Sequence, residues 1–305
     1  MLLFYDKSDG EGFSLIEKPR EGCWIHVEKA DRKDLEQICE LTGLHEADII
    51  DSLDRHEIPR VEKGHGFVLF FIRHPVEQER HLHTISLLIA LTERYFVTIA
   101  PSKSFIINEI LQGEDFAGGV ISSDLLTQIL QRTAQQFSNQ IRKARHSVMT
   151  QRKEIHVVES EDIFSLTEYE EILNQYLSSL DPLQDALESL IGIRPPIFHR
   201  KTYHDLDDIL NSIKQSDNLC NTLLKNIRSL RDSYQIVFAN KLTKTIQLLT
   251  ALTIVFSMPN MIASIYGMNV HLPIADKSGA FYILLVIMTV ISVLCGYWFY
   301  RKKWM

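Results

Sequence analysis

Polar side chains recur inside a stretch of the chain that carries no charge. Residues 245–266 contain no Asp, Glu, Lys, Arg or His, yet Thr, Ser, Gln and Asn interrupt the apolar run. Oxygens of this kind in an apolar environment either hydrogen-bond neighbouring helices or line an aqueous path. Three of them, together with a threonine just before the stretch, lie seven residues apart, which keeps these four on one face of a slightly supercoiled helix. These four are Thr243, Thr250, Ser257 and Ser264.

Serine and threonine commonly pack and hydrogen-bond between helices, so packing is the first interpretation of the stripe, and two amide side chains weaken it. Gln247 and Asn260 interrupt the same stretch, and amides are costly in lipid unless they meet partners or water. Several copies packed around an axis with this face inward would make a pore lined by neutral oxygens. Mg²⁺ dehydrates reluctantly, so a ring of Asn269 amides just beyond the helix could hold a hydrated ion through its waters. Gly267 is expected to allow a sharp turn there without a Cβ penalty.

Two uncharged runs must position these side chains. Residues 245–266 and 281–300 are each long enough, at about 1.5 Å per residue, to cross a hydrocarbon core of about 30 Å as a helix. The second run ends in Tyr297, Trp298, Phe299 and Tyr300, as expected at a bilayer interface. The intervening residues 267–280 are too few for a domain. The two spans therefore form a hairpin, and both chain ends lie on one side of the membrane.

Basic residues next to the spans indicate which side that is. Positively charged residues near membrane spans stay in the cytoplasm. The start of the chain has no basic segment followed by an apolar one, so no secretory signal is expected. We expect both termini in the cytoplasm and residues 267–280 outside. The basic residues are Lys241 and Lys244 before the first span and Arg301, Lys302 and Lys303 after the second.

Composition excludes several classes of function. A net charge of −7 disfavours a nucleic-acid partner, because phosphate binding needs a basic face. The four cysteines are scattered and form no C-x-x-C pair, which fits a reducing compartment and argues against structural zinc. No G-x-x-x-x-G-K-[ST] motif, nucleophile–base arrangement or metal-ligand cluster stands out. We therefore expect neither an enzyme nor an organic cofactor.

Residues 1–119 are predicted to form an α/β domain. Helical spacing of apolar residues predicts helices over 31–41, with Asp31 as the N-cap, and over 46–53. The apolar run 68–72 predicts a strand that is buried on both faces by helices. Strands are expected at residues 2–5, 23–27, 67–73, 84–90 and 95–99, which are rich in β-branched and aromatic residues.

The rest of the chain is predicted to be helical. A helical pair occupies 120–197 and ends at tandem prolines. A stalk helix over 198–266 continues into the first span, because no Gly or Pro interrupts it from residue 201 until Pro259. A helix of about 100 Å needs partners, and self-association supplies them. The external loop at 267–280, the second span at 281–300 and a basic tail at 301–305 complete the chain.

At the Tyr266-Gly267-Met268-Asn269 motif between the last two spans, the chain resembles the CorA family of divalent metal-ion transporters, which are homopentameric magnesium channels. The resemblance covers essentially the whole length. It includes the tail Lys302-Lys303-Trp304, the stalk over 240–250, and a helix over 44–51 followed by Pro59-Arg60-Val61-Glu62. It implies a cytoplasmic α/β domain, a long pore-lining helix, an outer second helix in the cell membrane, and gating by intracellular Mg²⁺ bound between subunits.

The resemblance also implies roles for individual residues. Asn269 corresponds to the entrance selectivity ring, Thr243 to a polar ring near the cytoplasmic mouth, and Ile246 and Leu249 to the hydrophobic constriction. Asp205 and Asp208 share a helix face and resemble the family's regulatory metal site, although an acidic helix start is also favoured by the helix dipole alone. The further pore positions are Thr253, Ser257, Asn260 and Ser264.

The expected function is therefore influx of Mg²⁺, and also of Co²⁺ or Ni²⁺, driven by the electrochemical gradient. One alternative is a zinc transporter of the same superfamily, which the intact Gly267-Met268-Asn269 motif disfavours. An alternative of another class is an oligomeric cytoplasmic sensor or scaffold that the hairpin merely anchors. A pure anchor has no need of Gln247, Ser257 and Asn260 on its inner helix.

Overall fold

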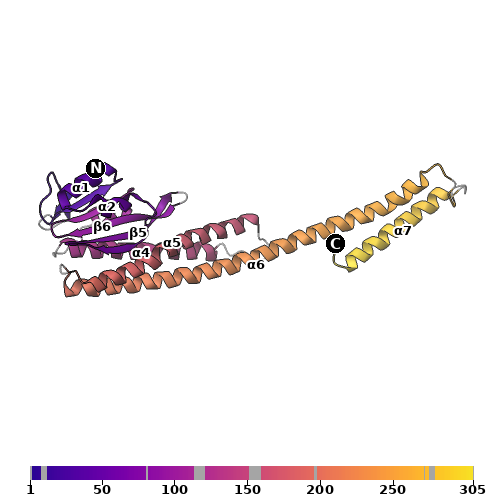
Figure 1. Ribbon diagram of the computed structural model, residues 1–305. Coiled ribbons are helices and arrows are strands. Elements are labelled where there is room, and N and C mark those ends of the chain that lie inside the picture. The colour runs from indigo at the N-terminus through magenta and orange to yellow at the C-terminus, as the bar shows by residue number, and fades with distance from the viewer. Residues whose placement is uncertain are drawn as a thin grey trace. The chain divides into compact units, whose positions relative to one another are not determined.

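The computed structural model describes residues 2–7, 12–79, 82–112, 121–150, 159–195, 198–270, 272–274 and 279–304. The chain divides into two compact units. The first, called the body below, comprises residues 1–152 and 164–230, and the second comprises 153–163 and 231–305. The domain boundaries expected at residues 119 and 197 stay predictions. Figure 1 labels the elements along the chain.

A seven-stranded mixed sheet forms the centre of the body, in the order β2-β1-β3-β7-β6-β5-β4. Neighbouring strands are antiparallel except β3 and β7, which are parallel and pair Trp24 with Phe96 and Val27 with Ile99. The five expected strands are confirmed, and β2 and β4 are two short additional strands at the edges. The strands are β1 (Leu2–Lys7), β2 (Phe13–Ile16), β3 (Trp24–Glu28), β4 (Arg60–Lys63), β5 (Phe67–Glu79), β6 (Leu82–Thr92) and β7 (Phe96–Ala100).

Short helices cover one face of this sheet. These are α1 (Arg32–Thr42), α2 (Glu46–Ile49) and the 3-10 turn η1 (Ile50–Leu53). Asp31 caps α1 as expected, because its carboxylate accepts the Asp34 backbone N–H and the Asp34 side chain accepts the N–H of Asp31 in return. Leu35 and Ile38 of α1 pack with Ile25, Leu69 and Val97 of the strands in one buried cluster.

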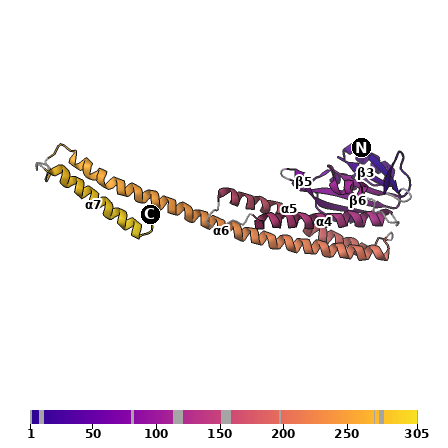
Figure 2. The same cartoon turned by 180° about the vertical axis from the view of Figure 1, so that it is seen from behind.

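Three long helices and the short α3 lie on the other side of the sheet, as Figures 1 and 2 show for the long ones. The Ser179 hydroxyl of α5 donates to Thr84 Oγ1 of β6 at 3.2 Å, which fixes α5 against the sheet. With helices on both sides, residues 68–72 of β5 are all buried, as expected. The helices are α3 (Phe105–Gln112), α4 (Ile121–Thr150), α5 (Ser160–Ile193) and the beginning of α6 (Arg200–Tyr266).

Two helices reach the end of the chain. α6 is continuous over 67 residues, from Arg200 through Pro259 to Tyr266, as expected from a stretch without Gly or Pro between residues 201 and 258. Within the body its apolar positions, among them Leu206, Ile213 and Ile227, are buried. The second helix, α7 (Ala280–Arg301), runs back beside the end of α6, and residues 245–266 together with α7 are called the hairpin below.

Candidate functional site

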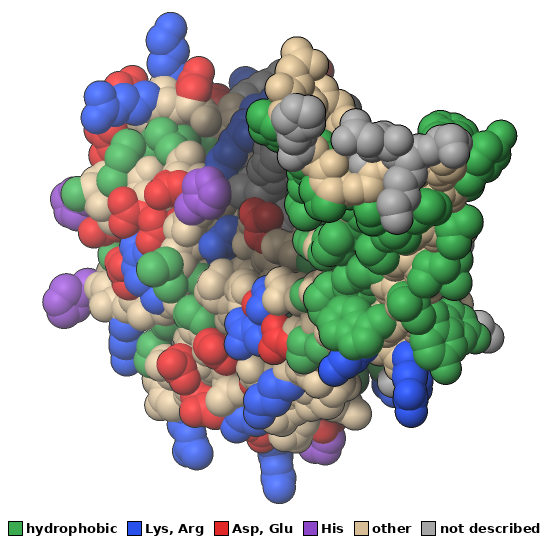
Figure 3. All heavy atoms as spheres, turned by 90° about the vertical axis from the view of Figure 1, so that its right-hand side faces the viewer, with side chains coloured by type: hydrophobic (Ala, Val, Ile, Leu, Met, Phe, Trp, Pro, Cys, Tyr) green, Lys and Arg blue, Asp and Glu red, His purple; other side chains and the backbone are tan. Residues whose placement is uncertain are grey.

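The hairpin exposes an apolar surface. α6 and α7 are the two helices, among the described residues, that are long and apolar enough to cross a membrane, and few residues of either apolar segment are buried within the chain. Phe256 and Tyr282 are more than 70% exposed. Figure 3 shows hydrophobic side chains gathered over this part of the molecule. Such a surface is stable in lipid, which solvates the side chains that the chain itself leaves uncovered.

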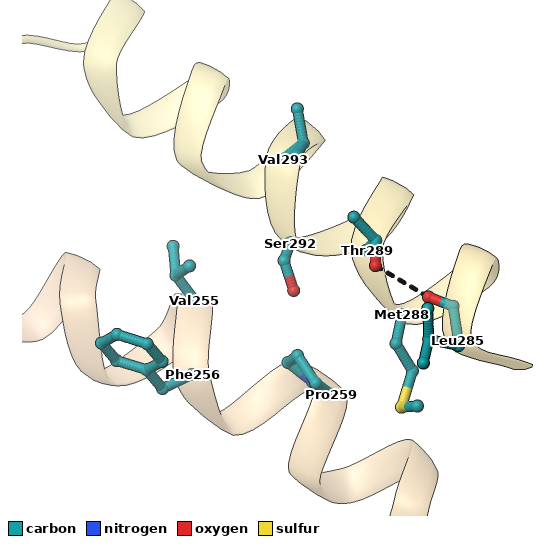
Figure 4. Close-up of a pocket in the computed structure, with 8 residues that line it drawn as sticks. All are labelled: Val255, Phe256, Pro259, Leu285, Met288, Thr289, Ser292 and Val293. Atoms are coloured by element: carbon teal, nitrogen blue, oxygen red, sulfur yellow. Dashed lines mark hydrogen bonds between the residues drawn. The ribbon is translucent and has the colours of Figure 1, made fainter.

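One face of α6 packs against α7. Ala251 is fully buried, and Val255, Pro259, Ile262 and Tyr266 are half-buried, at steps of three or four residues. An apolar cavity of about 350 Å³ lies between the two helices and is lined by Val255 and Pro259 from α6 and by Met288 and Ser292 from α7 (Figure 4). This face is therefore committed to the hairpin.

A polar position lies inside that contact. The Ser292 Oγ is buried and has no hydrogen-bond partner among the described residues. Figure 4 shows it directed from α7 toward Pro259. Pro259 has no N–H, so the carbonyl of Val255 loses its usual helical donor at the same level. The Ser292 hydroxyl, a donor, and the Val255 carbonyl, an acceptor, thus lie on facing helices. Lipid cannot form a hydrogen bond with either group.

The polar stripe lies on the opposite face of α6. A residue two positions along an α-helix points about 200° round the axis. Thr253 and Ser257 are each two positions beyond Ala251 and Val255, which face α7, and both are exposed. Asn260 and Ser264 are also exposed, as is Thr243. The described part of the chain, α7 included, leaves all five of these side chains exposed.

The two residues expected to form a hydrophobic constriction continue the same stripe. Ile246 is 55% exposed and Leu249 is 65% exposed. Counted at about 100° per residue, both lie within about 60° of Thr253 around the axis. The structure therefore brings all seven proposed pore positions onto one uncovered face of one helix.

Backbone hydrogen bonds fix how the threonines present their oxygens. Thr243 Oγ1 donates to the Ala239 carbonyl at 2.9 Å, and Thr253 Oγ1 donates to the Leu249 carbonyl at 2.8 Å. With its proton used in this way, each hydroxyl retains lone pairs as an acceptor. Such oxygens can receive hydrogen bonds from water without carrying charge.

The Tyr266-Gly267-Met268-Asn269 motif closes the end of α6. The Gly267 N–H donates to the Ala263 carbonyl at 3.0 Å, and the Met268 N–H donates to the Ile265 carbonyl at 3.2 Å. The Tyr266 hydroxyl donates to the Pro273 carbonyl at 3.1 Å and so ties the helix end to the loop. Asn269 is exposed.

The expectation about Gly267 is wrong for this structure. Its φ lies outside the left-handed region, and a Cβ placed on it would meet the Ala263 and Ser264 carbonyl oxygens at 3.5 Å, an ordinary contact. The chain leaves α6 through normal helix-end hydrogen bonds, which any residue can make. Backbone conformation therefore gives no reason for glycine at this position.

The expected regulatory residues lie near the start of α6. Asp205 is half-buried, whereas Asp208 is exposed and its Oδ2 is 3.2 Å from His204 Nδ1. Across the described parts of the chain, no group of three or more His, Cys, Asp or Glu residues is arranged to hold a metal.

A carboxyl pair on α5 and α6 was not predicted from the sequence. Burial and the neighbouring Asp181 carboxyl raise the pKa of Asp217 to about 6, while Asn221 Nδ2 donates to it at 3.1 Å. The two acids are far apart in the sequence, and no local pattern links them. Their proximity depends on how α5 packs against α6.

Comparison with known proteins finds relatives along the whole chain. The family described as "CorA-like Mg2+ transporter protein" matches residues 20–301. The cobalt/magnesium transport protein CorA of Thermotoga maritima is 22% identical over 292 residues, which cover 92% of this chain and 83% of that protein. The cobalt/magnesium transport protein CorA of Methanocaldococcus jannaschii is 24% identical over 296 residues, which cover 92% of this chain and 90% of that protein.

A solved structure extends the likeness to the fold. The complete CorA magnesium transporter from Methanocaldococcus jannaschii aligns with 100% of this chain and 99% of its own, with a TM-score of 0.82 at 22% identity. The α/β body, the long helix and the apolar C-terminal helix are thus shared with that protein.

Proposed function

The chain belongs to the CorA-like Mg²⁺ transporter family, and we propose that it forms a homopentameric channel through which Mg²⁺, and also Co²⁺ or Ni²⁺, enters the cell. The family description and the names of the cobalt/magnesium transport relatives support the ions. The pentamer rests on the resemblance to the family.

One observation carries the proposal. The seven proposed pore positions share the face of α6 that points away from α7, and all of them are exposed in the single chain. Copies arranged around an axis with this face inward would enclose a path of neutral oxygens. α7 would then lie on the outside, against lipid, as its exposed apolar side chains require.

The chemistry of the path suits a hydrated divalent cation. Mg²⁺ keeps its waters unless a site replaces them in near-ideal octahedral geometry. A ring of Asn269 amides at the outer end would select the hydrated ion by hydrogen bonds to its water. Thr243 would form a second polar ring near the cytoplasmic mouth, and Ile246 and Leu249 would close the path between them by excluding water.

The membrane potential supplies the driving force. Two positive charges that move inward through about 100 mV gain roughly 4.6 kcal/mol, so ATP hydrolysis is not required. The orientation that gives influx has both termini in the cytoplasm. It agrees with the basic residues Lys241 and Lys244 before the hairpin and Arg301 to Lys303 after it.

Intracellular Mg²⁺ is proposed to close the channel through Asp205 and Asp208 at a contact between copies. Asp205→Asn/Asp208→Asn is then expected to conduct at internal Mg²⁺ concentrations that stop the wild type. Proteoliposomes loaded with graded Mg²⁺ measure this inhibition. If the double variant were inhibited at the same concentration as wild type, these aspartates would not be the sensor.

Flux into proteoliposomes tests the function itself, with Mg²⁺, Co²⁺ and Zn²⁺ offered separately. We expect Asn269→Ala to abolish Mg²⁺ uptake while the oligomer still forms. Val270→Ala, an exposed neighbour just past the motif, is the matched control and should retain uptake.

Three results would contradict parts of the proposal. Wild-type flux in Asn269→Ala would remove the motif from the mechanism. Uptake of Zn²⁺ in preference to Mg²⁺ would favour the zinc-transporting alternative. A wild-type oligomer that conducts none of the three ions would favour an anchored sensor or scaffold.

A further inference from the structure

A large cavity opens in the body. Its volume is about 1580 Å³, above the roughly 300–1000 Å³ typical of small-molecule sites. Its wall is formed by the turns after β3 and β7, the end of β5, α3 and the second half of α4. Neither the proposed pore nor the aspartates at the start of α6 contribute to it.

The cavity lies at the carboxyl ends of the two parallel strands. The Ala30 N–H donates to the Ala100 carbonyl at 3.1 Å, and the Ser104 N–H donates to Glu28 Oε1 at 3.3 Å. These bonds hold the turn after β3 beside the turn after β7. In open α/β sheets, ligands bind in crevices at the carboxyl ends of strands, so the position is one that the fold favours for binding.

The charge of the wall is opposite to the charge of the protein. The chain as a whole carries −7. Among the described residues that line the cavity, Glu109 is the one acid, and it lies 3.4 Å from Arg132, which is not part of the wall. A concave basic surface in an acidic protein concentrates anions locally. The basic residues of the wall are Lys29, Arg55, Lys103, Arg142 and Lys143.

Lys29 is held in a costly backbone conformation at this wall. Its φ is 54°, in the left-handed region that glycine adopts without penalty. Glycine would therefore serve the turn better than lysine if the turn were the only requirement. Non-glycine residues in such strained conformations cluster at functional sites.

The rest of the lining suits a polar molecule with a flat part. Asn108, Asn139 and Gln140 offer amide donors and acceptors from α3 and α4. Phe105 is 61% exposed at the start of α3, although it is a large aromatic residue. An aromatic face next to amides and cations is the combination on which a base stacks while its phosphates are neutralised.

The floor contributes no charge. His74 is fully buried; its Nδ1–H donates to the Pro75 carbonyl at 3.1 Å, which leaves Nε2 to accept the Ser104 hydroxyl at 3.1 Å. Burial lowers the pKa of His74 to about 4. The attraction for anions therefore comes from the lysines and arginines of the wall.

We propose that this cavity binds a small, multiply charged phosphate compound, either a nucleoside polyphosphate or an inorganic polyphosphate. Cations converge on it from β3, the β7–α3 turn and α4, which fits several phosphate groups on one ligand rather than a single carboxylate. The concave wall excludes a duplex or a membrane surface, which need an extended basic face. The inference does not depend on ion transport by the hairpin.

Calorimetric titration of the full chain in detergent tests the proposal. Sodium tripolyphosphate and ATP are titrated separately in EDTA, so that no divalent cation contributes. We expect saturable binding of one anion per chain that weakens as salt rises. Lys103→Gln/Arg142→Gln should weaken it at least tenfold. Lys33→Gln/Arg145→Gln removes the same charges from positions outside the cavity and should change affinity less than twofold.

Lys29→Gly distinguishes weaker anion binding caused by the missing lysine from weaker binding caused by misfolding. Glycine relieves the backbone strain, so this variant should unfold at the same temperature as wild type or higher, yet bind the anion several-fold more weakly. Phe105→Ala separates the two ligand sources: it weakens ATP alone if a nucleotide is bound, and neither anion if inorganic polyphosphate is bound. No saturable binding at millimolar anion, or equal losses in the cavity and control double variants, would overturn the proposal.

Discussion

The body and the hairpin differ in whether their aromatic and polar side chains are buried within the chain or exposed. In the body, Trp24 and Phe70 are completely buried, and Thr98, also buried, accepts the Trp24 indole N–H at 2.8 Å and lies 2.8 Å from His26 Nδ1. In the hairpin, Phe281 is 70% exposed, and Asn260 and Ser264 of the pore stripe are exposed too.

The difference shows what completes each part. The body buries aromatic side chains such as Trp24 and Phe70, and buried polar groups such as Thr98 find their partners within the same chain. In the proposed channel, lipid would cover the apolar side chains of the hairpin, and neighbouring copies, with the water they enclose, would meet its polar face. The following changes test whether the body is self-sufficient and the hairpin is not.

The largest effect is expected from truncating a buried aromatic. Phe70→Ala should lower the free energy of unfolding of the body by about 3–5 kcal/mol, because it removes a buried ring and leaves a cavity. Phe281→Ala, the matched change in the hairpin, should alter it by less than about 0.5 kcal/mol. Urea unfolding in detergent, followed by circular dichroism, measures both. Equal losses would break the comparison.

Acid should weaken the body through its buried histidines. Burial lowers the pKa of His26 and of His74 to about 4, from an ordinary value of 6.5. The unfolded chain takes up these protons first, so the stabilisation is complete above pH 6.5 and is lost as pH falls toward 4. Between pH 6.5 and pH 4, the free energy of unfolding of His74→Asn is expected to fall by about 2–3 kcal/mol less than that of the wild type.

An exposed histidine provides the control for that measurement. His56→Asn removes an imidazole from the surface of the body and should keep the wild-type pH dependence of unfolding. The hairpin has no titratable Asp, Glu, Lys, Arg or His between residues 245 and 266 or between 281 and 300. A wild-type pH slope in His74→Asn would contradict the prediction.

Removing the hydrogen bonds around Thr98 should cause a smaller loss of stability. Thr98→Val keeps the shape of the side chain but leaves the Trp24 N–H and His26 Nδ1 without this partner, at a cost of about 1–3 kcal/mol. Thr243→Val removes an exposed hydroxyl that bonds its own helix and should cost less than about 0.5 kcal/mol. Comparable costs in the same urea titration would argue that the stripe is packed rather than open.

The smallest effect concerns Asp217. Its pKa of about 6 lies above the ordinary 3.8, so the folded chain holds a proton that the unfolded chain has released. Stability therefore falls as pH rises from about 4 to 6, and Asp217→Asn should raise the melting temperature at pH 7.5 by about 1–2 °C but not at pH 4. Asp207 is exposed on the same helix, and Asp207→Asn should leave the melting temperature unchanged at both pH values.

The fold could be predicted where periodicity is strong. The buried strands and α6 follow from long apolar or unbroken helical patterns. β2 and β4 were not predicted, because edge strands have one partner and carry polar residues, as in Arg60–Lys63. α3 was not predicted either, because Phe105–Gln112 is rich in isoleucine, which favours strands locally.

The candidate site was predictable for the same reason and only in part. Helical spacing alone assigned Thr243, Thr250, Ser257 and Ser264 to one face, but it could not say that α7 covers the opposite face. That requires tertiary packing, as does the Asp181–Asp217 pair. The basic cavity is lined by residues from five separate segments, so no local sequence pattern predicts it.

Cysteine accessibility tests most directly whether the face of α6 opposite α7 lines water. In a background that lacks Cys23, Cys39, Cys220 and Cys295, neighbouring positions are compared at the same depth: Ser257→Cys with Met258→Cys, and Ser264→Cys with Ile265→Cys. A charged, membrane-impermeant thiol reagent should modify the two serine positions and block Mg²⁺ flux. Met258→Cys and Ile265→Cys, about 100° round the helix, should stay unmodified. Equal modification within each pair, or protected serine positions, would contradict the account.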